Sequence, residues 1–354
     1  MTAAHPGLQD RPAYLDYNAT TPIDPRVLDA MLPYLTVEFG NPSSSHTYGR
    51  SSASALHEAR KQVAALVAAR PHEIVFTGSG TEADNLAIGG AVLASGTPRP
   101  HIVTQATEHP AVIAACEHLA RFHDADVTVL PVDGDGLVNP AAVAAAITPN
   151  TVLVTIMHAN NETGTIQPIA EIANVTRAAG VLLHCDAAQS VGKIDVDVAV
   201  LGVDLLTIVG HKMYAPKGVA ALYVRSGVDL VPLIGGGGQE NGRRAGTENV
   251  AYAVGLGVAA ELARTALQQG ETARLTMLRD HLLATLQDRL PGRVHLNGAA
   301  DHRLPNTVNV SIDRAPALGM LAAIPEVAAS AGSACHAGRD EPSPVLTAMG
   351  IPAA

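Results

Sequence analysis

The sequence predicts an α/β protein with a large and a smaller domain, and three observations carry this prediction. Up to about residue 250, short apolar runs alternate with segments whose apolar residues recur at helical spacing. Beyond it, long helical patterns dominate. The 354 residues, 47% hydrophobic and 16% charged, suffice for a packed protein of two domains. We expect a large domain over residues 13–255 and a small one over residues 256–354 together with residues 1–12.

Charge and composition argue against several classes of protein. The 23 Lys and Arg against 33 Asp and Glu leave a net charge of -10, which disfavours nucleic acid and anionic membranes as partners. The start, MTAAHPGLQDRP, has no apolar stretch, so we expect no secretion signal and a cytoplasmic location. No later apolar run is expected to reach spanning length. Cys116, Cys185 and Cys335 are far apart with no CxxC, which favours neither disulfides nor a structural zinc site.

The first elements are an extended piece, a loop and a helix. Residues 14–22, YLDYNATTP, form a short extended segment ending in a turn, and residues 39–46, FGNPSSSH, form a loop of turn formers. Apolar residues at helical spacing predict a helix over residues 56–67, which Pro71 ends.

A tight turn between a strand and a helix then suits a phosphate group. The three segments are residues 73–77, 78–81 and 82–94. Backbone N–H groups at a helix start have no partner within the helix, and Gly80 and Thr81 stand there. Gly78, Gly80 and Ala83 also match the dinucleotide pattern GxGxxA, but the next strand, residues 101–105, lacks the acidic residue that this pattern requires. A monophosphate therefore fits better.

Polar residues follow the later strands. We expect strands over residues 101–105, 127–130, 151–157, 181–185, 205–209 and 307–312, and helices after residue 107 and over residues 251–268 and 271–290. Asp186 follows one apolar strand directly and Lys212 follows another closely. Ligands of open α/β sheets bind beyond the carboxyl ends of strands, where a lysine can face a pocket. A carboxylate at a buried strand end is costly unless a cation meets it.

Pyridoxal 5'-phosphate is the one cofactor that uses all of these groups together. Lys212 would hold it as a Schiff base, and Asp186 would pair with the pyridinium nitrogen so that the ring stays an electron sink. The other predicted contacts are Gly80 and Thr81 to the phosphate, His109 stacked on the ring, and Asn161 and Gln189 to the 3'-oxygen.

Nine segments in order resemble the NifS/IscS-type cysteine desulfurases, which are class V aminotransferases and fold-type I pyridoxal phosphate enzymes. They are YLDYNATTP, FGNPSSSH, FTGSGTEADN, TEHPAV, MHANNETG, HCDAAQSVGK, GHKMYAPKG, GGGGQENGRRAGTEN and SAGSACHAG, spread over nearly the whole chain. The resemblance implies a large domain with a mostly parallel central sheet flanked by helices, and a smaller α+β domain. It also implies a homodimer with the active site at the subunit interface, where Thr247 of one chain reaches the phosphate bound by the other.

The resemblance further implies a reaction. L-cysteine would lose its sulfur to Cys335, the nucleophile on a mobile loop, giving L-alanine and a persulfide. The Lys212 amine would remove the substrate's α-proton, and His109 would act as acid or base for the thiol protons. The sulfur would pass to an acceptor such as an iron–sulfur scaffold protein or a tRNA-thiolation protein. We expect no resident metal, and whether Cys335 lends a transient ligand to a nascent iron–sulfur cluster stays open.

Three features depart from the family pattern: two residues and the end of the chain. Val209 stands where a serine commonly meets the phosphate, which removes one hydrogen bond. We expect this loss either to weaken cofactor retention or to be offset by His211 and backbone N–H groups. Ala215 replaces a usual glycine, a change of little chemical meaning. The chain stops at Ala354, before the family's carboxylate-gripping arginine, so we expect either a truncated sequence that turns cysteine over poorly or a substitute such as Arg243 or Arg244. Truncation is favoured, because the small domain would otherwise leave an apolar face uncovered.

Other functions remain as alternatives. Selenocysteine lyase, from the same family, fits Ala334-Cys335-His336 and the segment EPSPVL as well. A dinucleotide oxidoreductase could use the Gly78 turn but would leave Lys212 and Asp186 without a role. A truncated, catalytically weak cofactor-binding homologue and a non-catalytic interaction protein complete the set.

Overall fold

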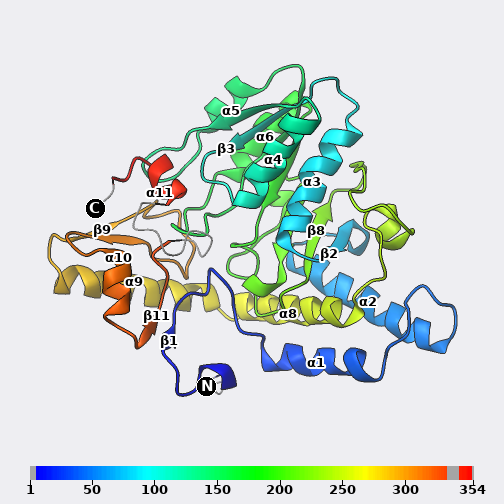
Figure 1. Cartoon of the computed structure of the whole chain (residues 1–354), viewed down its shortest axis with the longest axis horizontal. Helices are drawn as coiled ribbons and strands as arrows, with labels where there is room; N and C mark the ends of the chain where they lie inside the picture. Colours follow the sequence, from blue (N-terminus) through cyan, green and yellow to red (C-terminus); the bar gives the residue numbers. More distant parts are fainter. Residues whose placement is uncertain (1–4, 333–342, 353–354) are drawn as a thin grey trace.

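The computed structural model describes residues 5–332 and 343–352, and a seven-stranded sheet forms its centre. The strand order is β2-β8-β7-β6-β5-β3-β4, and Figure 1 shows helices on both faces of this sheet. The strands are β2 (Ile74–Thr77), β3 (His101–Gln105), β4 (Asp126–Leu130), β5 (Thr151–Thr155), β6 (Leu182–Asp186), β7 (Leu205–Val209) and β8 (Ala220–Val224). Only β8 runs antiparallel to its neighbours β7 and β2, so the prediction of a mostly parallel α/β sheet is confirmed.

Alternate residues of each strand pack into two separate cores, one on each face of the sheet. Val75 and Ile102 belong to one core, whereas the next residues, Phe76 and Val103, belong to the other. Both faces are therefore buried, which explains why the strands are nearly continuous apolar runs instead of alternating patterns.

Helices supply the other half of each core. One face is covered by α3 (Gly80–Ala94) and α4 (Pro110–Phe122). The other is covered by α1 (Pro25–Thr36), α2 (Thr47–Leu66), α5 (Pro140–Ala146), α6 (Ile169–Ala179), α7 (Val198–Leu201) and α8 (Val250–Gln268). Among these, α1, α5, α6, α7 and strand β8 were not among the predicted elements, and α2 begins nine residues before the predicted start at residue 56.

The long helix α8 packs lengthwise against α1 and α2, as the lower part of Figure 1 shows. The division expected between residues 255 and 256 falls inside this continuous helix, whose Leu256 and Ala260 are fully buried in the large core. By length and composition α8 is apolar enough to cross a membrane, which corrects the expectation that no apolar run reaches that length. Half of it is buried against the rest of the chain.

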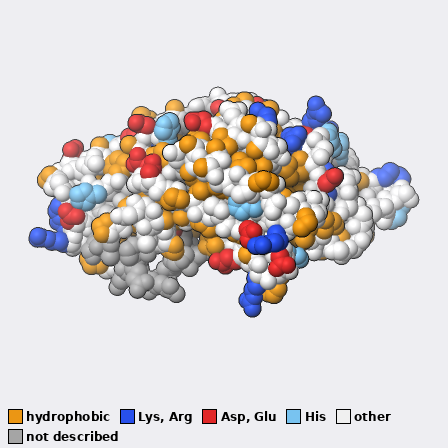
Figure 2. Space-filling view, turned by 90° about the horizontal axis from the view of Figure 1, so that it is seen from above, with side chains coloured by type: hydrophobic (Ala, Val, Ile, Leu, Met, Phe, Trp, Pro, Cys, Tyr) orange, Lys and Arg blue, Asp and Glu red, His pale blue; other side chains and the backbone are white. Residues whose placement is uncertain are grey.

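The remaining elements form two small sheets and three helices. They are β1 (Ala13–Tyr14) paired with β11 (Val327–Ala328), β9 (Val294–Leu296) paired with β10 (Val310–Ile312), and α9 (Glu271–Arg289), α10 (Ala317–Ala322) and α11 (Pro344–Ala348). Because β1 pairs with β11, the start of the chain is tied to a segment more than 300 residues later. On the face in Figure 2, Lys and Arg side chains lie in separate places and form no continuous basic patch.

Candidate active site

Lys212 follows β7 in a short 3-10 turn, Gly210–Lys212, at the carboxyl edge of the sheet. Its amine donates hydrogen bonds to the backbone carbonyls of Asn18, at 2.5 Å, and Ala19, at 2.8 Å. Both carbonyls belong to the turn over residues 17–19, which follows β1. The 3-10 turn and this segment together fix where the amine lies.

Asp186 is the last residue of β6 and is 5% exposed. Its carboxylate accepts a hydrogen bond of 2.9 Å from the Ala188 N–H. Burial raises the pKa of Asp186, and the Ala188 N–H, His109 and Lys212 oppose that rise. A cationic ring nitrogen is the kind of partner that such a carboxylate stabilises.

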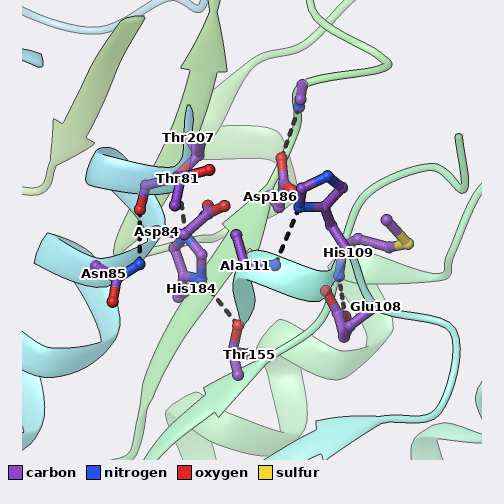
Figure 3. A network of polar contacts seen from close by, with 12 residues as sticks. Thr81, Asp84, Asn85, Glu108, His109, Ala111, Thr155, His184, Asp186 and Thr207 are labelled. Carbon is purple, nitrogen blue, oxygen red and sulfur yellow. Dashed lines mark hydrogen bonds and ion pairs between the residues drawn. The ribbon is translucent and has the colours of Figure 1, made fainter. Parts of the chain in front are cut away.

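His109 is the N-cap residue of α4 and points toward Asp186, as Figure 3 shows. Its Nδ1 accepts a hydrogen bond of 3.2 Å from the Ala111 N–H, which leaves the proton of the neutral ring on Nε2. Burial lowers the pKa of His109, with the Lys212 charge adding to this and Asp186 opposing it. The lowered pKa favours the neutral ring, which carries its proton on Nε2.

Two further carboxyl groups lie buried around Asp186 (Figure 3). Asp84, on α3, lies 3.7 Å from His184 Nε2, and its pKa is raised well above the ordinary value by burial and by the charge of Asp186. Burial raises the pKa of Glu108 to about 8. Asp84, His109 and Asp186 have ligand atoms within 4.8 Å of one another.

The predicted phosphate turn lies at the start of α3. The helix begins at Gly80, two residues before the predicted start, so Gly80 and Thr81 occupy its first turn with N–H groups that have no partner within the helix. A Cβ atom at Gly80 would come within 2.6 Å of Val209 Cγ2, so only glycine leaves this space open. Strand β7 therefore forms the floor of the turn.

Gln189, Asn161 and His211 contact residues 18–20, the segment that also holds the Lys212 amine. Gln189 Nε2 donates to the Asn18 carbonyl at 3.0 Å, and the Asn161 carbonyl accepts from the Asn18 side chain at 3.1 Å. His211 Nδ1 lies 3.1 Å from Thr20 Oγ1, and burial with nearby lysine charges lowers its pKa to about 4. The structure thus brings most predicted residues to one edge of the sheet.

Thr247 lies apart from this cluster. It is exposed and lines a cavity of about 190 Å³ that Thr77, Gly78 and Arg244 also line. Arg244, considered above as a residue that could hold the substrate carboxylate, is paired with Glu82 at 2.7 Å. Cys335 lies outside the described residues. The two cysteines within them, Cys116 and Cys185, are buried.

Sequence reasoning assigned no role to Asn18, Asp84, Glu108 or Lys193, each of which lies around this site. The only available signal was that all four stand inside the quoted motifs. Lys193 donates a hydrogen bond of 2.9 Å to Gln189 Oε1. Their roles depend on contacts between segments far apart in the chain.

The residues present fit pyridoxal phosphate. The cluster offers an amine, a buried carboxylate, a neutral imidazole and a glycine-shaped helix start. Lys212 would bind the aldehyde, Asp186 the ring nitrogen, and Gly80 with Thr81 the phosphate.

The chain is similar to known proteins over nearly its whole length. The family described as Aminotransferase class-V matches residues 13–353. Cysteine desulfurase IscS of Anaeromyxobacter dehalogenans is 49% identical over 343 residues, 96% of this chain and 84% of that protein. Cysteine desulfurase IscS of Dictyoglomus turgidum is 46% identical over 344 residues, 97% of this chain and 86% of that protein.

Solved structures agree. A "NifS-like protein" superposes with a TM-score of 0.87 at 33% identity, covering 96% of this chain and 90% of that one. A structure described as "SspA in complex with cysteine" superposes with a TM-score of 0.85 at 38% identity, covering 97% of this chain and 95% of that one.

Proposed function

This chain belongs to the class V aminotransferase family, and we propose that it is a cysteine desulfurase that uses pyridoxal 5'-phosphate to move sulfur from L-cysteine to a thiol of its own. The observation that carries the proposal is the convergence of Lys212, Asp186 and His109 at one sheet edge in a chain 49% identical to a relative of that name.

Each residue of the cluster has a task in this reaction. When bound, pyridoxal phosphate supplies an electron-accepting ring for chemistry at the substrate's α-carbon. The Lys212 amine would hold the cofactor and would take the α-proton of L-cysteine. Asp186 stabilises positive charge on the ring nitrogen. His109, whose pKa is lowered by burial, is the proposed acid or base for the thiol protons.

Cys335 is the proposed acceptor of the sulfur. Its thiolate forms a bond to the substrate sulfur while the substrate's carbon–sulfur bond breaks, leaving a persulfide on the protein and, after protonation, L-alanine. Burial raises the pKa of Cys116 to about 12 and that of Cys185 well above its ordinary value, so neither forms a thiolate readily. This inertness of both supports Cys335 as the nucleophile.

A homodimer is part of the proposal. Exposed apolar side chains on α1 and the loop after it would find cover in a second copy; they include Leu28, Leu32, Leu35 and Phe39. The exposure of Thr247 suits a residue that serves a partner's site. Sedimentation at micromolar protein would give the mass of two chains, and a monomer carrying full activity would contradict the dimer.

The test of the function is turnover with L-cysteine. The wild-type protein should form L-alanine and, in the presence of a reductant, an equal amount of sulfide, with a persulfide on Cys335 identified by mass spectrometry. Borohydride should fix a pyridoxyl group on Lys212. Cys335→Ser should abolish sulfide release and keep the pyridoxyl group, whereas the matched Cys116→Ser should keep both.

Two outcomes would contradict the proposal. A protein that takes up no pyridoxal phosphate is not an enzyme of this type. Faster turnover of selenocysteine, with cysteine inert, would favour selenocysteine lyase. An iron–sulfur scaffold or tRNA-thiolation acceptor and a cytoplasmic location stay predictions, to be tested by sulfur transfer to purified acceptors and by cell fractionation.

A further inference from the structure

Lys193 is a partly buried amine that the reaction above does not use. It donates a hydrogen bond of 2.9 Å to Gln189 Oε1, four residues earlier in the turn after β6. Within the residues that the structure describes, this neutral amide is its hydrogen-bond partner and no salt bridge to it is found. Burial, and secondarily the charge of Lys212, lower the pKa of Lys193 to about 7. Keeping a charged amine out of water with only a neutral partner costs folding free energy.

The turn that carries Lys193 is built to hold it in place. Gly192 has φ +79°, and a Cβ atom there would come within 3.2 Å of Ala263 and 3.3 Å of Met213, the residue after Lys212. The Lys193 carbonyl accepts a hydrogen bond of 3.0 Å from Thr272 Oγ1 on α9. The turn is thus clamped between α8, α9 and the lysine turn.

The hydrogen bond decides which way the Gln189 amide faces. In its charged form Lys193 can only donate, so it fixes the amide oxygen toward itself and the NH2 group on the opposite side. That NH2 group donates to the Asn18 carbonyl, which also receives the Lys212 amine at 2.5 Å. One chain of contacts therefore runs from Lys193 through Gln189 and Asn18 to Lys212.

We propose that Lys193 is a positioning residue for the cofactor, which orients the Gln189 NH2 group beside the Lys212 amine so that it donates to the 3'-oxygen of pyridoxal phosphate. The inference rests on the proposed function. The anionic 3'-oxygen would also give the Lys193 charge the negative neighbour that it lacks. Without Lys193 the amide could turn its oxygen toward the 3'-oxygen, and the two oxygens would repel.

The test compares three substitutions at one position. Lys193→Met keeps the apolar stem and removes the donor, so the Kd for pyridoxal phosphate should rise about tenfold, as expected for one lost hydrogen bond to a charged group. The Lys212–cofactor linkage should titrate at higher pH, read from the visible absorbance, since a nearby cation is gone. Lys193→Arg keeps a donor and should restore both values. Lys193→Gln keeps a neutral donor and should restore the affinity but not the titration.

Two controls separate this role from a structural one. Lys217→Met removes an exposed lysine whose charge reaches the same site and should leave the affinity unchanged. In a Gln189→Leu background, Lys193→Met should change the Kd by less than about twofold, because non-additivity marks residues that act through one another. Melting temperatures of the cofactor-free proteins show whether any variant is simply misfolded.

The outcomes are distinguishable. If wild-type protein takes up no pyridoxal phosphate on Lys212, the proposed function fails. If wild type binds pyridoxal phosphate on Lys212 but Lys193→Met has the same affinity and titration, only the positioning role is overturned. The same holds if Lys193→Met raises the Kd by as much in the Gln189→Leu background as in wild type.

Discussion

Glu108 Oε1 accepts a hydrogen bond of 2.6 Å from the backbone N–H of Met157, which joins the start of α4 to the end of β5. Gln105 donates a second bond to the same oxygen at 3.1 Å. The other oxygen, Oε2, is buried and has no partner among the described residues. Among these residues, only one of the two Glu108 oxygens therefore accepts hydrogen bonds. A buried carboxylate with one unpaired oxygen is unfavourable in its charged form, which agrees with the raised pKa of Glu108.

Replacing Glu108 by Gln should stabilise the cofactor-free protein at neutral and alkaline pH. Burial raises the pKa of Glu108 from 4.5 to about 8, so its contribution to stability is full below pH 4.5 and is lost as pH rises through 8. The gain in unfolding free energy from Glu108→Gln should be absent near pH 4. It should grow between pH 4.5 and pH 8 and reach roughly 1–3 kcal/mol above pH 8. Urea unfolding at several pH values measures it, and a gain independent of pH would contradict the raised pKa.

Asp186→Asn should separate stability from activity. Turnover should fall by about 10²–10³-fold, the usual cost of removing one preorganised electrostatic group. Because burial raises the pKa of Asp186 above 3.8, the cofactor-free variant should gain stability over wild type as pH rises beyond that value. A variant equal to wild type in turnover would exclude Asp186 as partner of the ring nitrogen.

Val209→Ser should tighten cofactor binding. Val209 Cγ2 lies against Gly80 at the start of α3, so a serine hydroxyl there would offer the phosphate one more donor. The Kd for pyridoxal phosphate should fall about tenfold, in line with a hydrogen bond to a charged group. Val209→Ala removes the methyl groups without adding a hydroxyl, and equal tightening by it would refute the explanation.

Glu240→Ala should destabilise the fold by about 3 kcal/mol, because it leaves the mostly buried Arg60, whose side chain is 16% exposed, without its carboxylate partner. Glu240 binds Arg60 through two contacts of 2.6 Å and also accepts from the Phe76 N–H, and its side chain is 2% exposed. Glu58→Ala breaks an exposed ion pair with Lys61 and serves as control, with a change of at most about 0.5 kcal/mol. Equal losses in the two variants would show that the Arg60 contact contributes little.

The sequence predicted the parallel strands well because each is a short apolar run ended by a turn or polar residue. Strands β3 and β7 match their expected bounds of 101–105 and 205–209. Glu73 was expected to open β2 but lies in a 3-10 turn, where its side chain accepts from the Arg70 and Ser226 N–H groups. A polar side chain in a local capping role leaves no periodic signal.

What sequence reasoning missed depends on contacts between distant segments. The role of Asn18 comes from its carbonyl, which any residue type would supply, so its identity gave no hint. In the sequence, Lys193 resembles a surface residue. Only the structure shows that the turn around Gly192 partly buries it. Groups whose chemistry lies in the side chain, such as Asp186 and Lys212, could be identified from type and spacing.

Asn18 connects the Lys212 amine to the C-terminal part of the chain. Its carbonyl receives Lys212, while its side chain bonds Thr307 at 2.9 Å and Asn306 at 3.0 Å, just before β10. Coupling between two sites is reciprocal. If the contacts of Asn18 with Thr307 and Asn306 affect how easily the Lys212 amine leaves the Asn18 carbonyl, then removal of the amine changes the stability of those contacts by the same free energy. Binding of the cofactor to Lys212 would therefore change the rates of amide hydrogen exchange near β9 and β10, far from the atoms that react.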